Sequence, residues 1–430
     1  MNPLLLATAI AFRGATLVDG TGSAACSDSL LVVSGGRIVA VGLATAEAIH
    51  NLPIGTEIRN VSGKWIVPGL VDAHVHAESD DDLKTMLRWG VTSVRLMAED
   101  ASAAARLAAE SRTRADIPQV FPAAPIFTTR GGWWDQGQPP DRSLNRFPAT
   151  PEEARRSVQR ARELGTREIK LMLDDMAWCR APRPALPRMA PEIAKALIEE
   201  ARSSGLRASV HAPNLADAKE AIADGATALA HGVLEPLDEK TIAVMTSRPV
   251  FYIPTMDIFE FLGDTHAFVD SVLADPFLTQ RTGGLPGDLV ARYRSAAYAE
   301  GYRQRYPNFE NVKARLAALR QNLRSLHRAG VPIALGTDMW AFPGLGVSIE
   351  MDLYVKSGIS SLEAIRAATQ TAARSLGIDG DRGTLEPGKR ADFLILDADP
   401  VADVKSIRRI RETYKNGQKV GPTVPATPHD

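Results

Sequence analysis

Six side chains of types that bind metals or carry protons each lie at or near the end of a short apolar run. They are His74, His76, Lys170, His211, His231 and Asp338. Neutral imidazoles and carboxylates bind zinc and similar ions at about 2.0–2.2 Å, and a catalytic site keeps one position open for water. A lysine ammonium cannot ligate a cation unless carbon dioxide first converts the amine to a carbamate, which is a bridging carboxylate. The set predicts a site for two divalent ions, with zinc as the expected metal and a carbamate on Lys170.

This set also suggests a reaction. Two metals about 3.5–4 Å apart can share a hydroxide, polarise a carbonyl or phosphoryl oxygen, and stabilise both attack and departure. Asp338 would ligate one metal, take the proton of that hydroxide and pass it to the leaving group. Each residue alone has a simpler explanation: an isolated histidine is often a satisfied core residue, and Lys170 could pair with Asp174 or Asp175. All six at strand ends, in chain order, favour the metal site.

The elements that must position these residues alternate short apolar runs with helical patterns. One unit is complete: Thr150-Pro151-Glu152-Glu153 is a helix start, Gly165 a helix stop, and residues 167–173 a buried strand. The other seven strands are expected at 65–76, 91–97, 119–127, 206–211, 226–231, 250–255 and 331–337. Eight strands alternating with helices predict an α/β fold, a parallel (β/α)8 TIM-like barrel, with the six residues at its C-terminal edge.

Both ends of the chain differ from this pattern, because they carry short β-rich runs with tight turns. The Ser34-Gly35-Gly36 sequence predicts a hairpin, and residues 383–396 have the same character. We expect residues 1–65 and 376–430 to build a small β-sandwich, the latter including a polar tail, and residues 66–375 to form the hydrolase barrel.

Two irregular stretches, 128–149 and 256–310, follow predicted strands and would lie over the C-terminal face. The first contains Arg130, Trp133 and Trp134, and a later loop contains Arg180. The tryptophans could stack on an aromatic or bulky apolar substrate, or could simply pack within the loop. Either arginine could bind a substrate carboxylate. No role is expected for His50, His266, His327, His429 or Cys179.

The sequence resembles the amidohydrolase superfamily. Pro68-Gly-Leu-Val-Asp-Ala-His-Val-His76 resembles its strand-one signature, Lys170 its carboxylated lysine, His211 and His231 its strand-five and strand-six ligands, and Gly336-Thr-Asp338 its strand-eight aspartate. Ile169–Leu173 and Leu229–Val233 look most like the Xaa-Pro dipeptidase (prolidase-like) branch. That branch often carries Gly-Gly-His after strand three, whereas Gly131-Gly132 is followed here by Trp133, which puts a dipeptide carboxylate clamp in doubt.

The resemblance implies a metal-dependent hydrolase that cleaves an amide bond in a dipeptide, an N-acyl amino acid or a cyclic amide. An esterase, a lactonase or a phosphotriester hydrolase could use the same site. A deaminase and a binding protein that has lost its metals are the remaining alternatives. The resemblance also implies a homo-oligomer.

The composition of the chain limits the classes of partner that it could bind. Lys plus Arg number 50 against 51 Asp plus Glu, for a formal net charge of -1, which argues against a basic nucleic-acid binder. No run of 18 apolar residues occurs, so we expect no membrane span. The expected partner is a small-molecule substrate. A cytoplasmic location is expected. Export stays an alternative, because the apolar residues 1–12 could be the remnant of a signal sequence.

Overall fold

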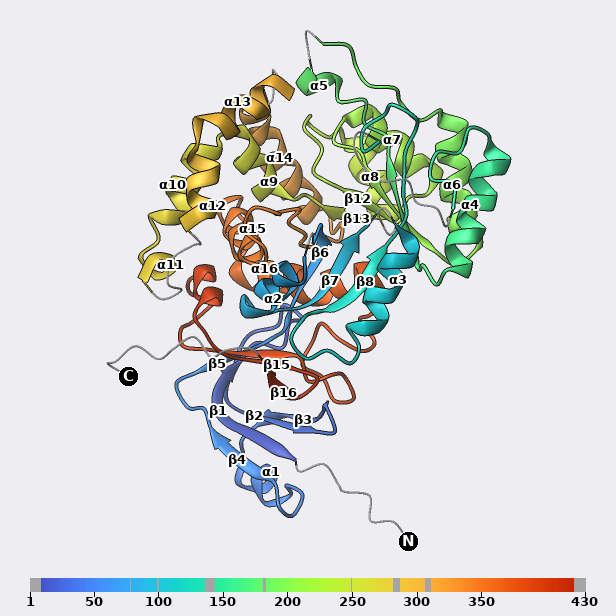
Figure 1. Ribbon diagram of the computed structural model, residues 1–430. Coiled ribbons are helices and arrows are strands. Elements are labelled where there is room, and N and C mark those ends of the chain that lie inside the picture. Colours follow the sequence, from blue (N-terminus) through green and yellow to red (C-terminus); the bar gives the residue numbers. More distant parts are fainter. Residues whose placement is uncertain are drawn as a thin grey trace.

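Strands from both ends of the chain form one mixed sheet in the computed structural model, which describes residues 9–77, 79–98, 100–135, 144–180, 183–248, 250–280, 287–305 and 311–420. The strand order is β16-β15-β14-β5-β1-β2-β3, and β4 pairs with β1. The strands are β1 (Ile10–Leu17), β2 (Cys26–Ser34), β3 (Arg37–Leu43), β4 (Glu57–Asn60), β5 (Trp65–Pro68), β14 (Phe393–Leu396), β15 (Ile410–Lys415) and β16 (Gln418–Val420). Figure 1 shows this sheet at one end of the molecule, below the parallel strands. Of the apolar start, residues 1–8 lie outside the described residues, and Ile10 already belongs to β1.

The mixed sheet is stabilised by a local turn and by a core drawn from both chain ends. Gly35 and Gly36 have φ angles of 58° and 79°, which the predicted hairpin between β2 and β3 requires and which glycine adopts without steric cost. The rings of Phe393 and Tyr414 stack with centroids 4.3 Å apart, and Phe12 meets both edge-on at 5.1 Å. The two ends therefore come together as predicted, in one hydrogen-bonded sheet, whereas their division into a two-layered sandwich stays a prediction.

Two parallel sheets contain the other strands. One has the order β6-β7-β8, the other β13-β12-β11-β10-β9. Their bounds are β6 (Leu70–Val75), β7 (Val91–Met97), β8 (Gln119–Ala123), β9 (Ile126–Phe127), β10 (Glu168–Met172), β11 (Arg207–His211), β12 (Ala228–Ala230) and β13 (Phe251–Ile253). The prediction at 91–97 is confirmed. The single strands expected at 65–76 and 119–127 are each two strands, because Gly69 and Ala124-Pro125 interrupt them and β5 pairs into the mixed sheet.

The last expected strand, at 331–337, is not a regular strand in the described residues. It is held by backbone hydrogen bonds on two sides. Beside β13, the Tyr252 N–H donates to the Pro332 carbonyl and the Tyr252 carbonyl accepts from Ala334, and beside β6 the Ala73 N–H donates to the Leu335 carbonyl. The structure thus shows an α/β fold in which this segment links the two parallel sheets, and the regular eight-stranded barrel stays a prediction.

Helices cover the parallel sheets. Thr150 caps α4 as predicted, since its side chain accepts the N–H of Glu153. The helices that follow strands or lie near them are α1 (Ala46–His50), α2 (Asp80–Arg88), α3 (Ala101–Glu110), α4 (Pro151–Glu163), α5 (Ala177–Arg180), α6 (Pro191–Ser203), α7 (Leu215–Asp224), α8 (Glu239–Ser247) and α14 (Asn311–Arg328). The C-terminal part adds α15 (Leu345–Lys356), α16 (Ser361–Arg366), η1 (Ala367–Thr371), α17 (Ala372–Leu376) and η2 (Val404–Arg408).

The irregular stretch expected at 256–310 is largely helical where it is described. It contains α9 (Met256–Gly263), α10 (Thr265–Leu273), α11 (Pro276–Gln280), α12 (Gly287–Arg294) and α13 (Ala296–Arg305). These helices gather on one side of the molecule (Figure 1). Among the described residues, no helix combines the length and apolar character that crossing a bilayer would require.

Candidate metal centre

The candidate site begins at β6, where alternation places Asp72, His74 and the following His76 on one face of the strand. Asp72 is buried. Its Oδ1 accepts the backbone N–H groups of His74 and Thr337, each at 3.0 Å, and its Oδ2 accepts the Thr337 hydroxyl at 2.7 Å. Asp72 therefore ties the end of β6 to the segment that carries Asp338. Sequence reasoning gave Asp72 no role, although its i, i+2 spacing from His74 was the available signal.

Three predicted ligands, His74, His231 and Asp338, form a candidate metal site, because their ligand atoms all lie within 4.8 Å of one another. His74 Nε2 lies 3.8 Å from Asp338 Oδ1, and His231 Nδ1 lies 3.8 Å from Asp338 Oδ2. Neither ring nitrogen of His74 has a hydrogen-bond partner among the described residues, although the ring is buried. Buried nitrogens without partners cost free energy, so a ligand for them is chemically reasonable.

Backbone strain gathers near this group. The φ angles of His231, Asp338 and Thr255 are 80°, 56° and 45°, in the left-handed region that favours glycine. Trp134 and Met176, in loops that reach the site, have φ angles of 72° and 59°. Strained non-glycine backbone concentrates at functional sites, where the surrounding structure enforces it.

His76 and His211 lie next to the three-residue group. His76 Nε2 is 3.4 Å from Asp338 Oδ1, and the ring centroid of His211 is 4.5 Å from that of His231. His231 Nδ1 also lies 3.0 Å from the hydroxyl of Thr255, a residue that sequence reasoning did not single out. The structure thus brings all four predicted histidines together, and the role of each of them as a metal ligand stays a prediction.

Lys170, on β10, is buried, and its Nζ has no hydrogen-bond partner among the described residues. The pairing with Asp174 or Asp175 that the sequence left open is wrong, since Lys170 Nζ contacts neither carboxylate, and the hydrogen bonds of Asp174 go to other groups. Asp175 accepts the N–H of Ala177. Burial lowers the pKa of Lys170, against the opposing effect of the nearby Asp338 carboxylate.

Electrostatics favour uncharged imidazoles. Burial first, and the Lys170 charge among the further causes, lower the pKa of all four histidines: that of His76 falls to about 3, and those of His74 and His231 fall well below the usual value. Burial also raises the pKa of the Asp338 carboxyl, while Lys170 opposes the rise. Neutral imidazole nitrogens have the lone pair that a metal requires.

An aromatic wall borders the histidines. The Trp134 ring lies 5.0 Å from that of His76, Trp133 meets Trp134 edge-on at 5.8 Å, and Phe259 lies 6.2 Å from His231. The wall is fastened through backbone carbonyls, since Thr128 donates to the Trp133 oxygen at 2.7 Å and Arg146 to the Trp134 oxygen at 2.8 Å.

The two arginines expected to bind substrate are engaged elsewhere. The exposed Arg130 guanidinium lies 3.9 Å from the ring centroid of Phe147, and Arg180 donates to the Pro184 carbonyl at 2.9 Å. No contact joins either arginine to the four histidines in the described residues. That either arginine binds a substrate carboxylate stays a prediction.

The residues that were given no role lie apart or are buried. His50 ends α1, His266 is exposed on α10, and His327 lies 3.6 Å from Glu363. The Cys179 thiol is buried, which raises its pKa and disfavours the thiolate. His429 lies outside the described residues.

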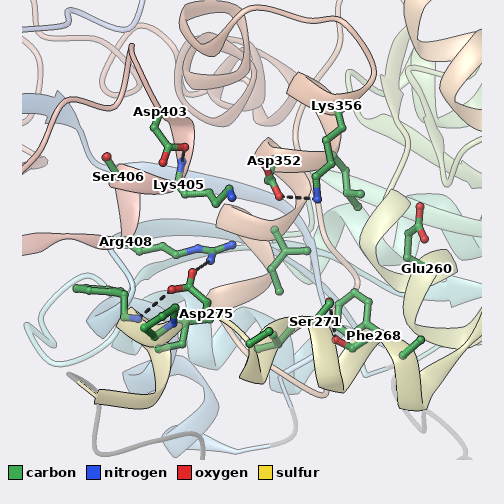
Figure 2. Close-up of a pocket in the computed structure, with 18 of the residues that line it drawn as sticks. Glu260, Phe268, Ser271, Asp275, Asp352, Lys356, Asp403, Lys405, Ser406 and Arg408 are labelled. Atoms are coloured by element: carbon green, nitrogen blue, oxygen red, sulfur yellow. Dashed lines mark hydrogen bonds and ion pairs between the residues drawn. The ribbon is translucent and has the colours of Figure 1, made fainter.

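A cavity of about 630 Å³ lies elsewhere, between α9–α11, α14, α15 and η2. Figure 2 shows two ion pairs in its lining, one between Arg408 and Asp275 and one between Lys356 and Asp352 on α15. None of the six predicted metal-binding residues lines it. Its charged groups are largely paired, so it offers no comparable cluster of free ligand atoms.

Comparison with known proteins gives four findings. A family model described as the amidohydrolase family matches residues 65–420. The Aspergillus niger protein ochratoxinase is 28% identical over 272 residues, which is 62% of this chain and 49% of that protein, so the match spans about half of the relative's length. The crystal structure of A. niger ochratoxinase has a TM-score of 0.73 at 21% identity, with 98% of each chain covered. A crystal structure of a Xaa-Pro dipeptidase with bound methionine has a TM-score of 0.74 at 20% identity, covering 96% of this chain and 100% of that one. At these identities the structural likeness supports the shared fold alone.

Proposed function

The chain belongs to the amidohydrolase family, and from that premise we propose that it hydrolyses an amide bond in a small molecule, as a prolidase-like or ochratoxinase-like enzyme. The observation that carries the proposal is the convergence of His74, His231 and Asp338 within 4.8 Å, with Lys170 buried in the same region and without a hydrogen-bond partner in the part of the chain that is described. A lone histidine pair would carry much less weight, because core histidines are common.

The donor set fits a metal-binding role. We propose that His74, His76, His211, His231 and Asp338 would hold two divalent ions, with a modified Lys170 as a further ligand. Nitrogen and oxygen donors suit zinc, although manganese and cobalt accept the same ligands. Bound ions of this kind polarise a carbonyl oxygen and lower the pKa of water.

Lys170 supports the proposal through its environment. An ammonium held in a dry interior without a hydrogen-bond partner is costly, and burial therefore favours the neutral amine. The neutral amine is the form that reacts with carbon dioxide: a bond forms between Nζ and the carbon, and one proton leaves. The resulting carbamate carries negative charge, which would balance part of the charge of two divalent ions.

Asp338 is proposed to carry the proton. Its carboxylate lies 3.4 Å from His76 and 3.8 Å from both His74 and His231, at the centre of the group. Burial raises its pKa, so the protonated form is accessible near neutral pH. Asp338 can thus take a proton as water attacks the amide carbon and donate it to the departing amine nitrogen.

The aromatic wall suggests the substrate class. Trp133, Trp134 and Phe259 offer ring surfaces beside the histidines, and such surfaces favour bulky apolar or aromatic groups. We propose an N-acyl amino acid or dipeptide with a large apolar group next to the scissile amide.

The fold proposal follows from the same geometry. We propose that the two parallel sheets and residues 331–338 act as one (β/α)8 barrel, since Asp338 N–H and Ala73 N–H make backbone bonds across the join. The six candidate residues would then lie on its C-terminal face, where such barrels carry their sites. The mixed sheet would form the separate accessory unit expected from residues 1–65 and 376–430.

Elemental analysis of the purified chain, followed by a panel of matched amides and esters, tests the function. About two divalent ions per chain and turnover of the amides support the proposal. If the esters are hydrolysed and the matched amides are not, the protein is an esterase and the amidase proposal is wrong. One ion per chain would favour a deaminase-like site. No metal, even after expression with added zinc and bicarbonate, would favour a binding protein.

A further inference from the structure

Asp174 follows β10, in the loop after Lys170, and no part of the proposed reaction uses it. Its side chain is completely buried. Its Oδ1 accepts the backbone N–H of Met176 at 2.8 Å and the amide of Asn214 at 2.9 Å. Its Oδ2 accepts the indole N–H of Trp178 at 2.9 Å. An ionised carboxylate offers about four acceptor positions, so these three donors leave one position open.

His211 is placed to fill that position. Its Nε2 lies 3.4 Å from Asp174 Oδ2. An ionised carboxylate can only accept, so the nitrogen that faces it must carry the proton. The three hydrogen bonds that Asp174 accepts, from Met176, Asn214 and Trp178, favour the ionised carboxylate.

The other ring nitrogen of His211, Nδ1, is available to bind a ligand. His211 Nδ1 is buried and has no hydrogen-bond partner among the described residues. A neutral imidazole with its proton on Nε2 has a lone pair on Nδ1. The ring lies 4.5 Å from that of His231, within the candidate metal centre.

We propose that Asp174 is a positioning residue, which accepts the Nε2 proton of His211 and so presents the Nδ1 lone pair to the candidate metal centre. The inference rests on the proposed function for the identity of the ligand that Nδ1 meets. Partners that accept from the far nitrogen of a metal-binding histidine fix its tautomer and ring orientation, and losing one costs about 10- to 100-fold in metal affinity.

The Asp174 loop is built to hold this carboxylate still. Met176 adopts a φ of 59°, which turns its N–H back toward Asp174. Leu173 donates its N–H to the His211 carbonyl at 3.2 Å, which fixes the backbones of β10 and β11 side by side. Trp178 extends from α5 and His211 from the end of β11, and both approach the same oxygen atom, Asp174 Oδ2.

The test uses the full-length, metal-free protein with ¹⁵N-labelled histidine. Long-range ¹H–¹⁵N NMR reports the tautomer of His211, assigned by the signal lost in His211→Gln. Wild type is expected to carry the proton on Nε2. In Asp174→Asn the Nε2-protonated population should fall, and affinity for added zinc, measured by competition with a chelating dye, should fall about 10- to 100-fold.

The matched control is Asp175→Asn, because Asp175 is the neighbouring residue. Its carboxylate accepts the N–H of Ala177 and makes no contact with His211 among the described residues. This variant should keep both the tautomer and the zinc affinity. A wild-type His211 protonated on Nδ1 would overturn the inference, and that measurement decides it even if Asp174→Asn does not fold. Unchanged tautomer and affinity in a folded Asp174→Asn would overturn it too. Wild type that binds no zinc or manganese would instead count against the proposed function.

Discussion

The backbone N–H of Asp338 donates to the carbonyl oxygen of His74 at 2.8 Å. Two candidate ligands from opposite ends of the central region are thus joined through the main chain, before any side-chain contact is made. Asp72 reinforces the join, since its carboxylate accepts N–H groups on both sides of it. The positions of His74 and Asp338 are therefore set by this main-chain hydrogen bond together with the Asp72 carboxylate.

Replacing Lys170 with alanine should empty or cripple the metal site, because the proposed bridging carboxylate is lost. We expect activity to fall on the order of 100-fold or more, along with metal content. Short carboxylic acids added to the variant should restore part of the activity by supplying the missing oxygen ligands. Full activity without such rescue would exclude the carbamate. Lys195→Ala, an exposed lysine on α6, is the control and should change neither quantity.

Asp338→Asn should retain most of the metal and lose the proton carrier. An amide side chain can still offer an oxygen, but it cannot take up and release a proton near neutral pH. We expect kcat to fall about 10²- to 10⁴-fold, the usual contribution of general acid–base catalysis. Steady-state kinetics with parallel metal analysis would check this, and a variant with wild-type kcat would remove Asp338 from the role.

Trp134→Ala should alter substrate preference more than metal content. The indole lies beside His76, and aromatic contacts contribute about 0.5–1.5 kcal/mol. The KM for aromatic substrates should therefore rise roughly 2- to 10-fold relative to small aliphatic ones. Trp134→Phe keeps a ring and should fall in between. Equal effects on both substrate classes would assign Trp134 to loop packing, and Trp133→Ala tests its neighbour in the same way.

Asp257→Asn should change how stability depends on pH. Asp257 and Glu350 are both fully buried, and Glu350 accepts the N–H groups of Met256 and Asp257 at 2.9 and 2.7 Å. Burial, with Glu350 as the next cause for Asp257, raises the pKa of both carboxyls, that of Glu350 to about 8. The folded state therefore holds a proton that the unfolded state has released above about pH 4.

The sign follows from proton linkage. The stabilising effect of this pair is complete below about pH 4 and is lost as pH rises toward about 8, by at most about 1.4 kcal/mol per pH unit for one proton. Asp257→Asn removes one of the two carboxyls, so the variant should gain stability relative to wild type between pH 5 and 8. Urea unfolding of the metal-free proteins across this range measures the difference, in which the histidine contributions cancel. A pH-independent difference would contradict the shared proton.

The candidate chemistry-bearing residues and most of the strands could be predicted from the amino-acid sequence, because the physical signals are local. Alternation on a strand puts His74 and His76 on one face, capping residues and glycines delimit α4, and apolar runs of a few residues become buried strands. The position of each candidate ligand near a strand end was readable in the same way, as was the pairing of the two β-rich chain ends.

How polar groups distant in sequence meet became visible only in the folded chain. Asp72 joining Thr337, Asp174 accepting from Trp178 and facing His211, and Thr255 lying beside His231 all depend on which strand ends are neighbours and how each loop turns. The sequence pattern left Asp174 as a candidate partner of Lys170, because charge alone does not indicate direction. The buried Asp174 carboxylate accepts hydrogen bonds from Met176, Trp178 and Asn214, and Lys170 has no hydrogen-bond partner among the described residues.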